Sequence, residues 1–150
     1  MRDIKFRGKR ISDGKWVYGY PLDLGINGFE ILVVTETDEL DENGDISFLH
    51  AIERIEVNCE TVGQCIGKQD KSNNDIYEGD ICQILWQIDD EGGKPDTVIT
   101  AQITFEGGSF WFRGIDYNVC DCNWHFYDRS DIEVIGNIYD NPELLEEAKQ

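Results

Sequence analysis

Residues 97–113, TVITAQITFEGGSFWFR, carry the most regular hydropathy pattern in the chain. Apolar and polar residues alternate before Gly107-Gly108, and successive residues of a strand point to opposite faces of a sheet. The glycine pair predicts a tight turn, after which the chain returns as a second strand. The stretch therefore predicts an antiparallel hairpin whose inner face carries Ile99, Ala101, Ile103, Phe105, Phe110 and Phe112.

Outward from this hairpin, short apolar or alternating runs bounded by turn residues recur along the chain. Ser12-Asp13-Gly14 separates two such runs, and in the second Trp16, Tyr18 and Tyr20 share one face. Strands are predicted at Ile4–Ile11, Lys15–Leu22, Phe29–Thr35, Ile46–Ile52, Thr61–Ile66, Asp80–Ile88, Thr97–Glu106, Ser109–Arg113 and Asp131–Tyr139. Because they do not alternate with helices, we expect an all-β, mostly antiparallel fold, with an SH3-like barrel-type portion within Asp80–Tyr139.

A single short helix is predicted at the C-terminus. Asn141 is a favourable N-cap, Pro142 suits the first helical position and Glu143 complements the positive helix end. A helix this short must dock on the sheet to be stable.

One domain is the natural organisation for 150 residues, with two joined lobes as a variant of it. The lobes would be residues 1–60, with N-terminal hairpins and an acidic loop, and residues 61–150, with the barrel-like portion and the helix. No apolar run approaches the length of a membrane helix, and the start, MRDIKFRGKR, does not resemble a secretory signal. We expect a protein of the bacterial cytoplasm without a membrane partner.

The charge is strongly negative and unevenly distributed. The net charge is −18, yet six basic and two acidic residues give the first fifteen positions a net +4, which leaves −22 for the rest. The acidic body argues against direct nucleic-acid binding, which needs clustered Lys and Arg. The basic N-terminal segment could pair with an acidic face of a second copy, although surface charge also serves solubility alone.

The most acidic segment is Glu36–Asp45, which we expect to form an exposed loop or the tip of a hairpin. Its carboxylates resemble the opening of a calcium loop, but the distal Glu of such a loop is replaced by Ile52. A solvated acidic loop is therefore favoured over a calcium site. The carboxylates are Asp38, Glu39, Asp41, Glu42 and Asp45.

Five cysteines and two histidines offer limited chemistry. Cys120, Cys122 and His125 are the best metal candidates, but structural zinc needs four ligands and no pattern supplies a fourth from Cys59 or His50. Neither histidine lies in a nucleophile motif. No metal, cofactor or catalytic residue is predicted, while Cys65 and Cys82 are expected to be small buried residues.

The segment Ser109–Tyr127 is unusually aromatic and has two interpretations. Its rings either fill the core or form an exposed interface. They are Trp111, Phe112, Tyr117, Trp124, Phe126 and Tyr127.

Three segments together resemble the YopX family, small proteins carried mainly by bacteriophages and prophages. They are IKFRGKR at Ile4–Arg10, TVGQCIGKQDKSNNDIYEGDIC at Thr61–Cys82 and VIGNIYDNPELL at Val134–Leu145. The resemblance implies an all-β protein with a barrel-like portion and self-association, and it implies no catalytic residues. In physical terms, Gly79 is expected to adopt a positive φ in a turn, and Gly136 to permit a bulge or close packing.

These observations favour a non-enzymatic phage or prophage accessory protein that acts as a homo-oligomer or by contact with a host or phage protein. The alternative is an acidic decoy that imitates nucleic acid and binds a basic host protein. An enzyme of unrecognised type is the third hypothesis.

Overall fold

The computed structural model describes residues 4–25, 28–40, 46–86, 97–114, 122–123 and 132–147. The chain divides into two compact units, Asp3–Gln64 and Cys65–Gln150. All strand pairings among the described residues are antiparallel, which confirms the predicted all-β class. The strands are β1 (Phe6–Arg10), β2 (Trp16–Asp23), β3 (Phe29–Leu40), β4 (Ile46–Gln69), β5 (Asp75–Tyr77), β6 (Asp80–Trp86), β7 (Thr97–Glu106), β8 (Ser109–Gly114), β9 (Cys122–Asn123) and β10 (Ile132–Asn137), and the helix is α1 (Leu144–Glu147).

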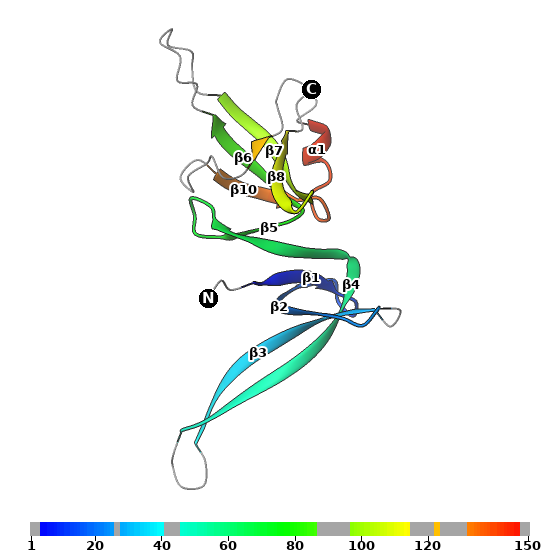
Figure 1. Ribbon diagram of the computed structural model, residues 1–150, viewed down its shortest axis with the longest axis vertical. Helices are drawn as coiled ribbons and strands as arrows, with labels where there is room; N and C mark the ends of the chain where they lie inside the picture. Colours follow the sequence, from blue (N-terminus) through cyan, green and yellow to red (C-terminus); the bar gives the residue numbers. More distant parts are fainter. Residues whose placement is uncertain are drawn as a thin grey trace. The chain divides into compact units, whose positions relative to one another are not determined.

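The first unit is a four-stranded ring. Strands β1, β2, β3 and β4 pair in sequence, and β1 also pairs with β4, so the sheet closes on itself (Figure 1). The partly closed sheet therefore lies in the first unit, whereas the sequence predicted a curled, barrel-type sheet within Asp80–Tyr139. Its core consists of Val17, Ile31, Ile55 and Val57, with Phe6, Phe29, Val33 and Val62 packed against them.

A break in the register of β4 helps the ring to close. Arg7 pairs with Gly63 but Lys9 pairs with Asn58, so extra residues of β4 bulge out between them. The hydroxyl of Thr61 accepts from the Lys9 N–H at 2.8 Å and donates to the Asn58 carbonyl at 2.7 Å. One side chain therefore takes the place of lost ladder bonds at the bulge.

The β3–β4 ribbon corrects the prediction for the acidic segment. Glu36–Leu40 belongs to β3 and pairs with Ile46–His50, as far as the pair Leu40 and Ile46. The hairpin alternative is therefore confirmed for these residues, and a loop across all of Glu36–Asp45 is wrong. Residues 41–45 lie outside the described residues. Ile46–Ile52 is likewise only the start of a 24-residue strand.

The second unit contains a five-stranded sheet in the order β10-β6-β7-β8-β9. The predicted hairpin of β7 and β8 is present, and its inner residues Ile99, Ala101, Ile103, Phe110 and Phe112 are buried. Phe105 departs from the prediction, because its side chain is 46% exposed near the end of β7. Its ring centroid lies 4.9 Å from that of Phe110. Cys65 and Cys82 are buried as expected.

Asp70 fixes the turn between β4 and β5 to β10. Its side chain is 1% exposed and accepts hydrogen bonds from the N–H groups of Ser72, Asn74 and Val134 and from the Asn74 amide. Burial alone would raise the pKa of this carboxyl, but the hydrogen bonds from Asn74, Val134 and Ser72 outweigh it and lower the pKa. The charge of Asp70 is thus part of the fold.

The two signature glycines behave as predicted. Gly79 has a φ of 84° in the turn before β6, where the buried Asp80 carboxylate accepts from the Tyr77 N–H at 2.8 Å. Gly136 follows a register shift in β10, and a Cβ on it would lie 2.6 Å from Oδ1 of Asn141.

The C-terminal helix is shorter than predicted. It begins at Leu144, and Pro142 and Glu143 form a turn before it. The Asn141 side chain accepts from the N–H of Asn137 rather than capping the helix. No helix in the described part of the chain could span a membrane.

Candidate functional site

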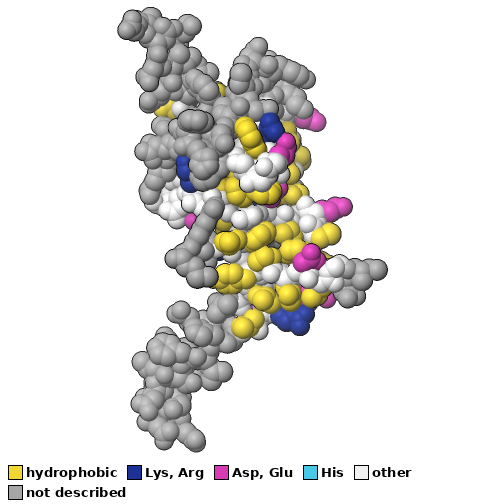
Figure 2. All heavy atoms as spheres, viewed as in Figure 1, with side chains coloured by type: hydrophobic (Ala, Val, Ile, Leu, Met, Phe, Trp, Pro, Cys, Tyr) yellow, Lys and Arg dark blue, Asp and Glu magenta, His cyan; other side chains and the backbone are white. Residues whose placement is uncertain are grey.

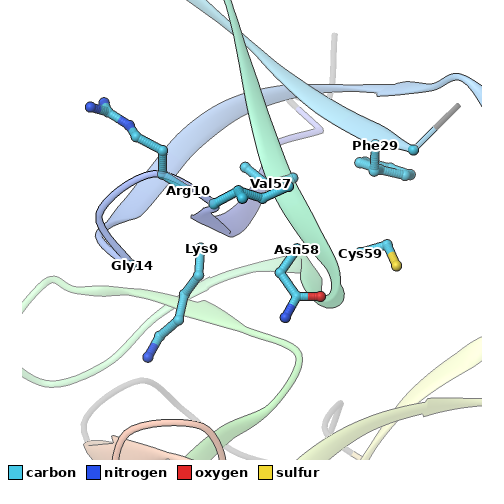
Figure 3. A pocket seen from close by; sticks show the side chains of 9 residues that line it. Lys9, Arg10, Gly14, Phe29, Val57, Asn58 and Cys59 are labelled. Atoms are coloured by element: carbon cyan, nitrogen blue, oxygen red, sulfur yellow. The ribbon is translucent and has the colours of Figure 1, made fainter.

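An open pocket of about 540 Å³ lies at one end of the ring in the first unit, and we call it the ring-mouth pocket. The wall comes from the end of β1, the following turn, the start of β3 and the middle of β4. Figure 3 shows the Lys9 and Arg10 side chains on one side of Val57, extending away from it in different directions, and Phe29 and Cys59 on the other side. The lining residues are Lys9, Arg10, Ile11, Gly14, Gly28, Phe29, Val57, Asn58 and Cys59.

Turn chemistry shapes this ring-mouth pocket. Gly14 has a φ of 70°, donates to the Arg10 carbonyl at 2.9 Å and so tightens the β1–β2 turn. Gly28 has a φ of 103° and donates to the carbonyl of Gly25 at 3.2 Å just before β3 begins. Asn58 stands at the β4 bulge, where its side chain accepts from the Glu60 N–H. The apolar floor is Phe29 and Val57, which are register partners.

The ring-mouth pocket is cationic on an otherwise acidic protein. Lys9 and Arg10 are consecutive on β1 and leave the strand in opposite directions, so their charged ends point away from each other (Figure 3). Among the described residues that line the pocket there is no carboxylate. The Arg10 guanidinium forms an exposed pair with the Asp13 carboxylate at 3.6 Å. Such a pair is weak, so an anionic ligand could displace it.

An aromatic face adjoins Lys9. Tyr18 and Tyr20 of β2 are exposed, and the Trp16 ring lies beneath two cations. The Arg7 guanidinium carbon is 4.5 Å and the Lys9 ammonium 5.4 Å from the Trp16 ring centroid. The alternation predicted for β2 is confirmed, since Val17 between these rings is buried.

A second open pocket, of about 370 Å³, shares Arg10 and Ile11 with the first and is more mixed in charge. Its other lining residues are Ser12, Glu53, Arg54, Ile55 and Glu56. Between the two pockets stands Ile11, which is 65% exposed. Figure 2 shows hydrophobic side chains open on the surface of the first unit.

The metal candidates named from the sequence that the structure describes do not line either pocket, apart from Cys59. Cys122 lies in β9, whereas Cys120 and His125 are outside the described residues. Within the described ranges no group of three or more His, Cys, Asp or Glu could hold a metal ion. His50 pairs with Glu36 in the β3–β4 ribbon.

The aromatic segment Ser109–Tyr127 is described only in part. Among the rings predicted to fill the core or form an interface, the structure describes Trp111 and Phe112. Phe112 is 1% exposed and therefore core. Trp111 is half-buried, donates to the Glu106 carbonyl at 3.1 Å and lies under Arg113. Tyr117, Trp124, Phe126 and Tyr127 lie outside the described residues.

The ring-mouth pocket was missed from the sequence, because its walls come from four separated segments. The one available signal was the basic N-terminal cluster, which contains Lys9 and Arg10. Closing of β1 onto β4 turns that cluster into one side of a concave surface.

The strand pairing and the division of the chain define a class: an antiparallel β protein of two compact units, with two open pockets on the first. The chain belongs to the YopX family, since the family model described as YopX protein matches residues 5–146. The crystal structure of protein EF1440 from Enterococcus faecalis is similar in fold, with a TM-score of 0.55 and 20% identity over 97% of this chain and 99% of that chain. No curated protein matches the chain.

Proposed function

We propose that this YopX-family chain is a non-enzymatic, self-associating module that a phage or prophage supplies to the cytoplasm of its bacterial host. The observation that carries the proposal is the β3–β4 ribbon. Among the described residues, Val33–Leu40 pairs only with β4, and Ile46–Ile55 pairs only with β3. Both outer edges of the ribbon thus offer backbone N–H and C=O groups to another strand.

A two-stranded ribbon on its own is marginally stable in water. The β4 side of this one, Ile46–His50, reads ISFLH and contains neither Lys, Arg, Asp nor Glu. Natural proteins protect sheet edges with charges, prolines or a covering element, and this segment contains none of the residues used for protection. Pairing with a second chain would cover it.

The base of the ribbon and the neighbouring face add apolar contact area. Ile52 is 63% exposed, and Tyr18 and Tyr20 are exposed on β2. Aromatic side chains are favoured anchors of protein interfaces, because they bury much area at a low entropic cost. A second copy is the simplest occupant, and a host or phage protein is the other.

The test is a ribbon-shortened variant studied beside the unmodified protein. Thr35 and Ala51 are register partners, so joining them through Asn-Gly removes residues 36–50 and keeps a two-residue hairpin. Light scattering coupled to size-exclusion chromatography should give a multiple of 17.2 kDa for the full chain and a monomer for the variant. A full chain of 17.2 kDa at every concentration would contradict self-association.

The decoy alternative makes a separate prediction. A basic nucleic-acid-binding host protein should then co-purify with the chain and dissociate at high salt. Affinity purification from lysogenic cells distinguishes the two, since self-association needs no host protein.

A further inference from the structure

We infer that the outer face of β1 and β2 binds a single strand of nucleic acid, whose bases stack on Tyr18 and Tyr20. Such binding goes beyond the proposed function, which is carried by the edges of the ribbon and does not need these two rings. The net charge of −18 predicted no direct nucleic-acid binding, because that binding needs clustered Lys and Arg. Pairing of β1 with β2 supplies such a cluster on one face of one sheet.

The register of the two strands brings cations and aromatic rings to the same face. Arg7 lies opposite Tyr18, and Lys9 lies opposite Trp16. Alternate residues of a strand point to the same side of a sheet, and Val17, between two of the rings, is buried in the core of the ring. The outer face of β1 and β2, with the residue before β1, therefore carries Lys5, Arg7, Lys9, Trp16, Tyr18 and Tyr20.

Tyr18 and Tyr20 supply the stacking surface. Their side chains are 50% and 45% exposed. Residues two apart on a strand are separated by about 6.8 Å, which is twice the spacing of about 3.4 Å between neighbouring nucleotides along one strand of a duplex. Two such rings therefore suit bases that are unstacked from each other, as they are in single-stranded recognition.

The cations lie beside the rings, on β1. Neighbouring strands are about 4.8 Å apart, so the phosphate of a nucleotide whose base stacks on β2 lies over β1. Lys5 and Lys9 are half-buried and are the residues that meet phosphates. Arg7 is 6% exposed, and its guanidinium carbon lies 4.5 Å from the centroid of the Trp16 ring. It therefore holds that ring and adds positive potential to the face without contacting the ligand itself.

Carboxylates limit the extent of this face. Glu30 of β3 lies opposite Leu22 of β2 on one side and opposite Glu56 of β4 on the other. Nε of Arg54 is 2.6 Å from Oε2 of Glu30 and offsets one of these two negative charges. A polyanion is therefore directed along β1 and β2 and not across β3 toward β4.

A strand of nucleic acid suits the face better than an acidic peptide does. Carboxylate side chains would use the two lysines but would leave the tyrosine rings without a flat partner. Every nucleotide combines a phosphate with a planar base, which is the combination that this face offers to bind.

Fluorescence anisotropy on the full-length chain tests the stacking contact. The probe is a labelled single-stranded DNA of about ten nucleotides, compared with a duplex of the same sequence. The ring variant is Tyr18→Ala with Tyr20→Ala. Its matched control is Val98→Ala with Phe105→Ala, which removes two exposed apolar side chains from β7. Circular dichroism confirms that each protein is folded.

The salt dependence of binding tests the phosphate contacts separately. Each phosphate contact with a single strand contributes about −0.7 to the slope of log K against log salt concentration. Lys5→Gln with Lys9→Gln should therefore make that slope less steep by about 1.4. Lys15→Gln with Lys71→Gln removes two exposed lysines outside this face and should leave the slope unchanged.

We expect the ring variant to bind the single strand at least ~10-fold more weakly than the unmodified protein, its control to bind normally and the duplex to bind more weakly than the single strand. No saturable binding of the single strand at low salt, undiminished binding by the ring variant or equal binding of the duplex would overturn the inference. Displacement of the probe by poly-glutamate at the same concentration of negative charge would also overturn it, since the face would then select an acidic protein segment. None of these outcomes bears on self-association, which the molar mass of the protein alone reports.

Discussion

Replacing Asp70 with Asn tests whether a buried carboxylate fixes the β4–β5 turn to β10. Oδ1 accepts from the N–H groups of Ser72 at 2.9 Å and Asn74 at 2.8 Å. Oδ2 accepts from the Asn74 amide at 3.1 Å and from the N–H of Val134 at 3.2 Å. An Asn side chain can retain the two hydrogen bonds that Oδ1 accepts. Its NH₂ group would replace Oδ2 and face the other two donors, so those two hydrogen bonds would be lost.

The expected cost follows from those two lost bonds. A hydrogen bond to a charged acceptor contributes about 1.5–3 kcal/mol, so we expect the free energy of unfolding of the second unit to fall by about 3 kcal/mol at pH 7. That is a large fraction of the roughly 5–15 kcal/mol that stabilises a domain. Asp75→Asn is the matched control, because its carboxylate accepts only from the Gln69 side chain among the hydrogen bonds described here and lies nearer the surface.

The assay is urea unfolding followed by circular dichroism, with hydrogen exchange of the Val134 amide as a local probe. The pKa of Asp70 is lowered in the folded state, so its stabilising effect is present above the unfolded pKa of about 3.9 and is lost as the pH falls through the folded value. The difference between the unmodified protein and Asp70→Asn should shrink between pH 7 and pH 3. A loss no larger than that of Asp75→Asn, or a difference unchanged across this range, would refute the reasoning.

Three further predictions concern packing and access. Gly19→Ala places a Cβ 2.2 Å from the Leu32 carbonyl oxygen, so β3 must shift, and thermal unfolding should show a loss of about 1–3 kcal/mol that Ser12→Ala, in the exposed turn, does not. Cys59 is exposed while the thiols of Cys65 and Cys82 are buried, so a maleimide should label Cys59 faster than either in the native state. Gly136→Ala would bring a Cβ within 2.6 Å of the Asn141 side chain, which should displace α1 and raise proteolysis near the C-terminus.

The sequence predicted the local elements well. Alternation in β7 and β8 correctly identified the buried residues Ile99, Ala101, Ile103, Phe110 and Phe112, because inward positions recur at every second residue and a glycine turn joins the two strands. Phe105 failed this rule, since it is the next-to-last residue of β7 and the core does not extend to it.

The acidic segment was harder to predict, because Asp and Glu are depleted in strands. Its pairing with the β-favouring residues of Ile46–His50 overrides that local preference. The sequence also missed residues 53–60 of β4, although Ile55 and Val57 alternate there with charged and polar neighbours.

Ring closure could not be predicted from pattern at all. The pairing of β1 with β4 joins residues about fifty positions apart, and no local periodicity encodes it. The ring-mouth pocket depends on that closure, so the candidate site became visible only in three dimensions.

Sedimentation equilibrium of the unmodified full-length chain, over a range of concentrations, tests the central claim most directly. Association through the ribbon predicts a molar mass that rises with concentration toward a multiple of 17.2 kDa. A mass of 17.2 kDa throughout that range would contradict it.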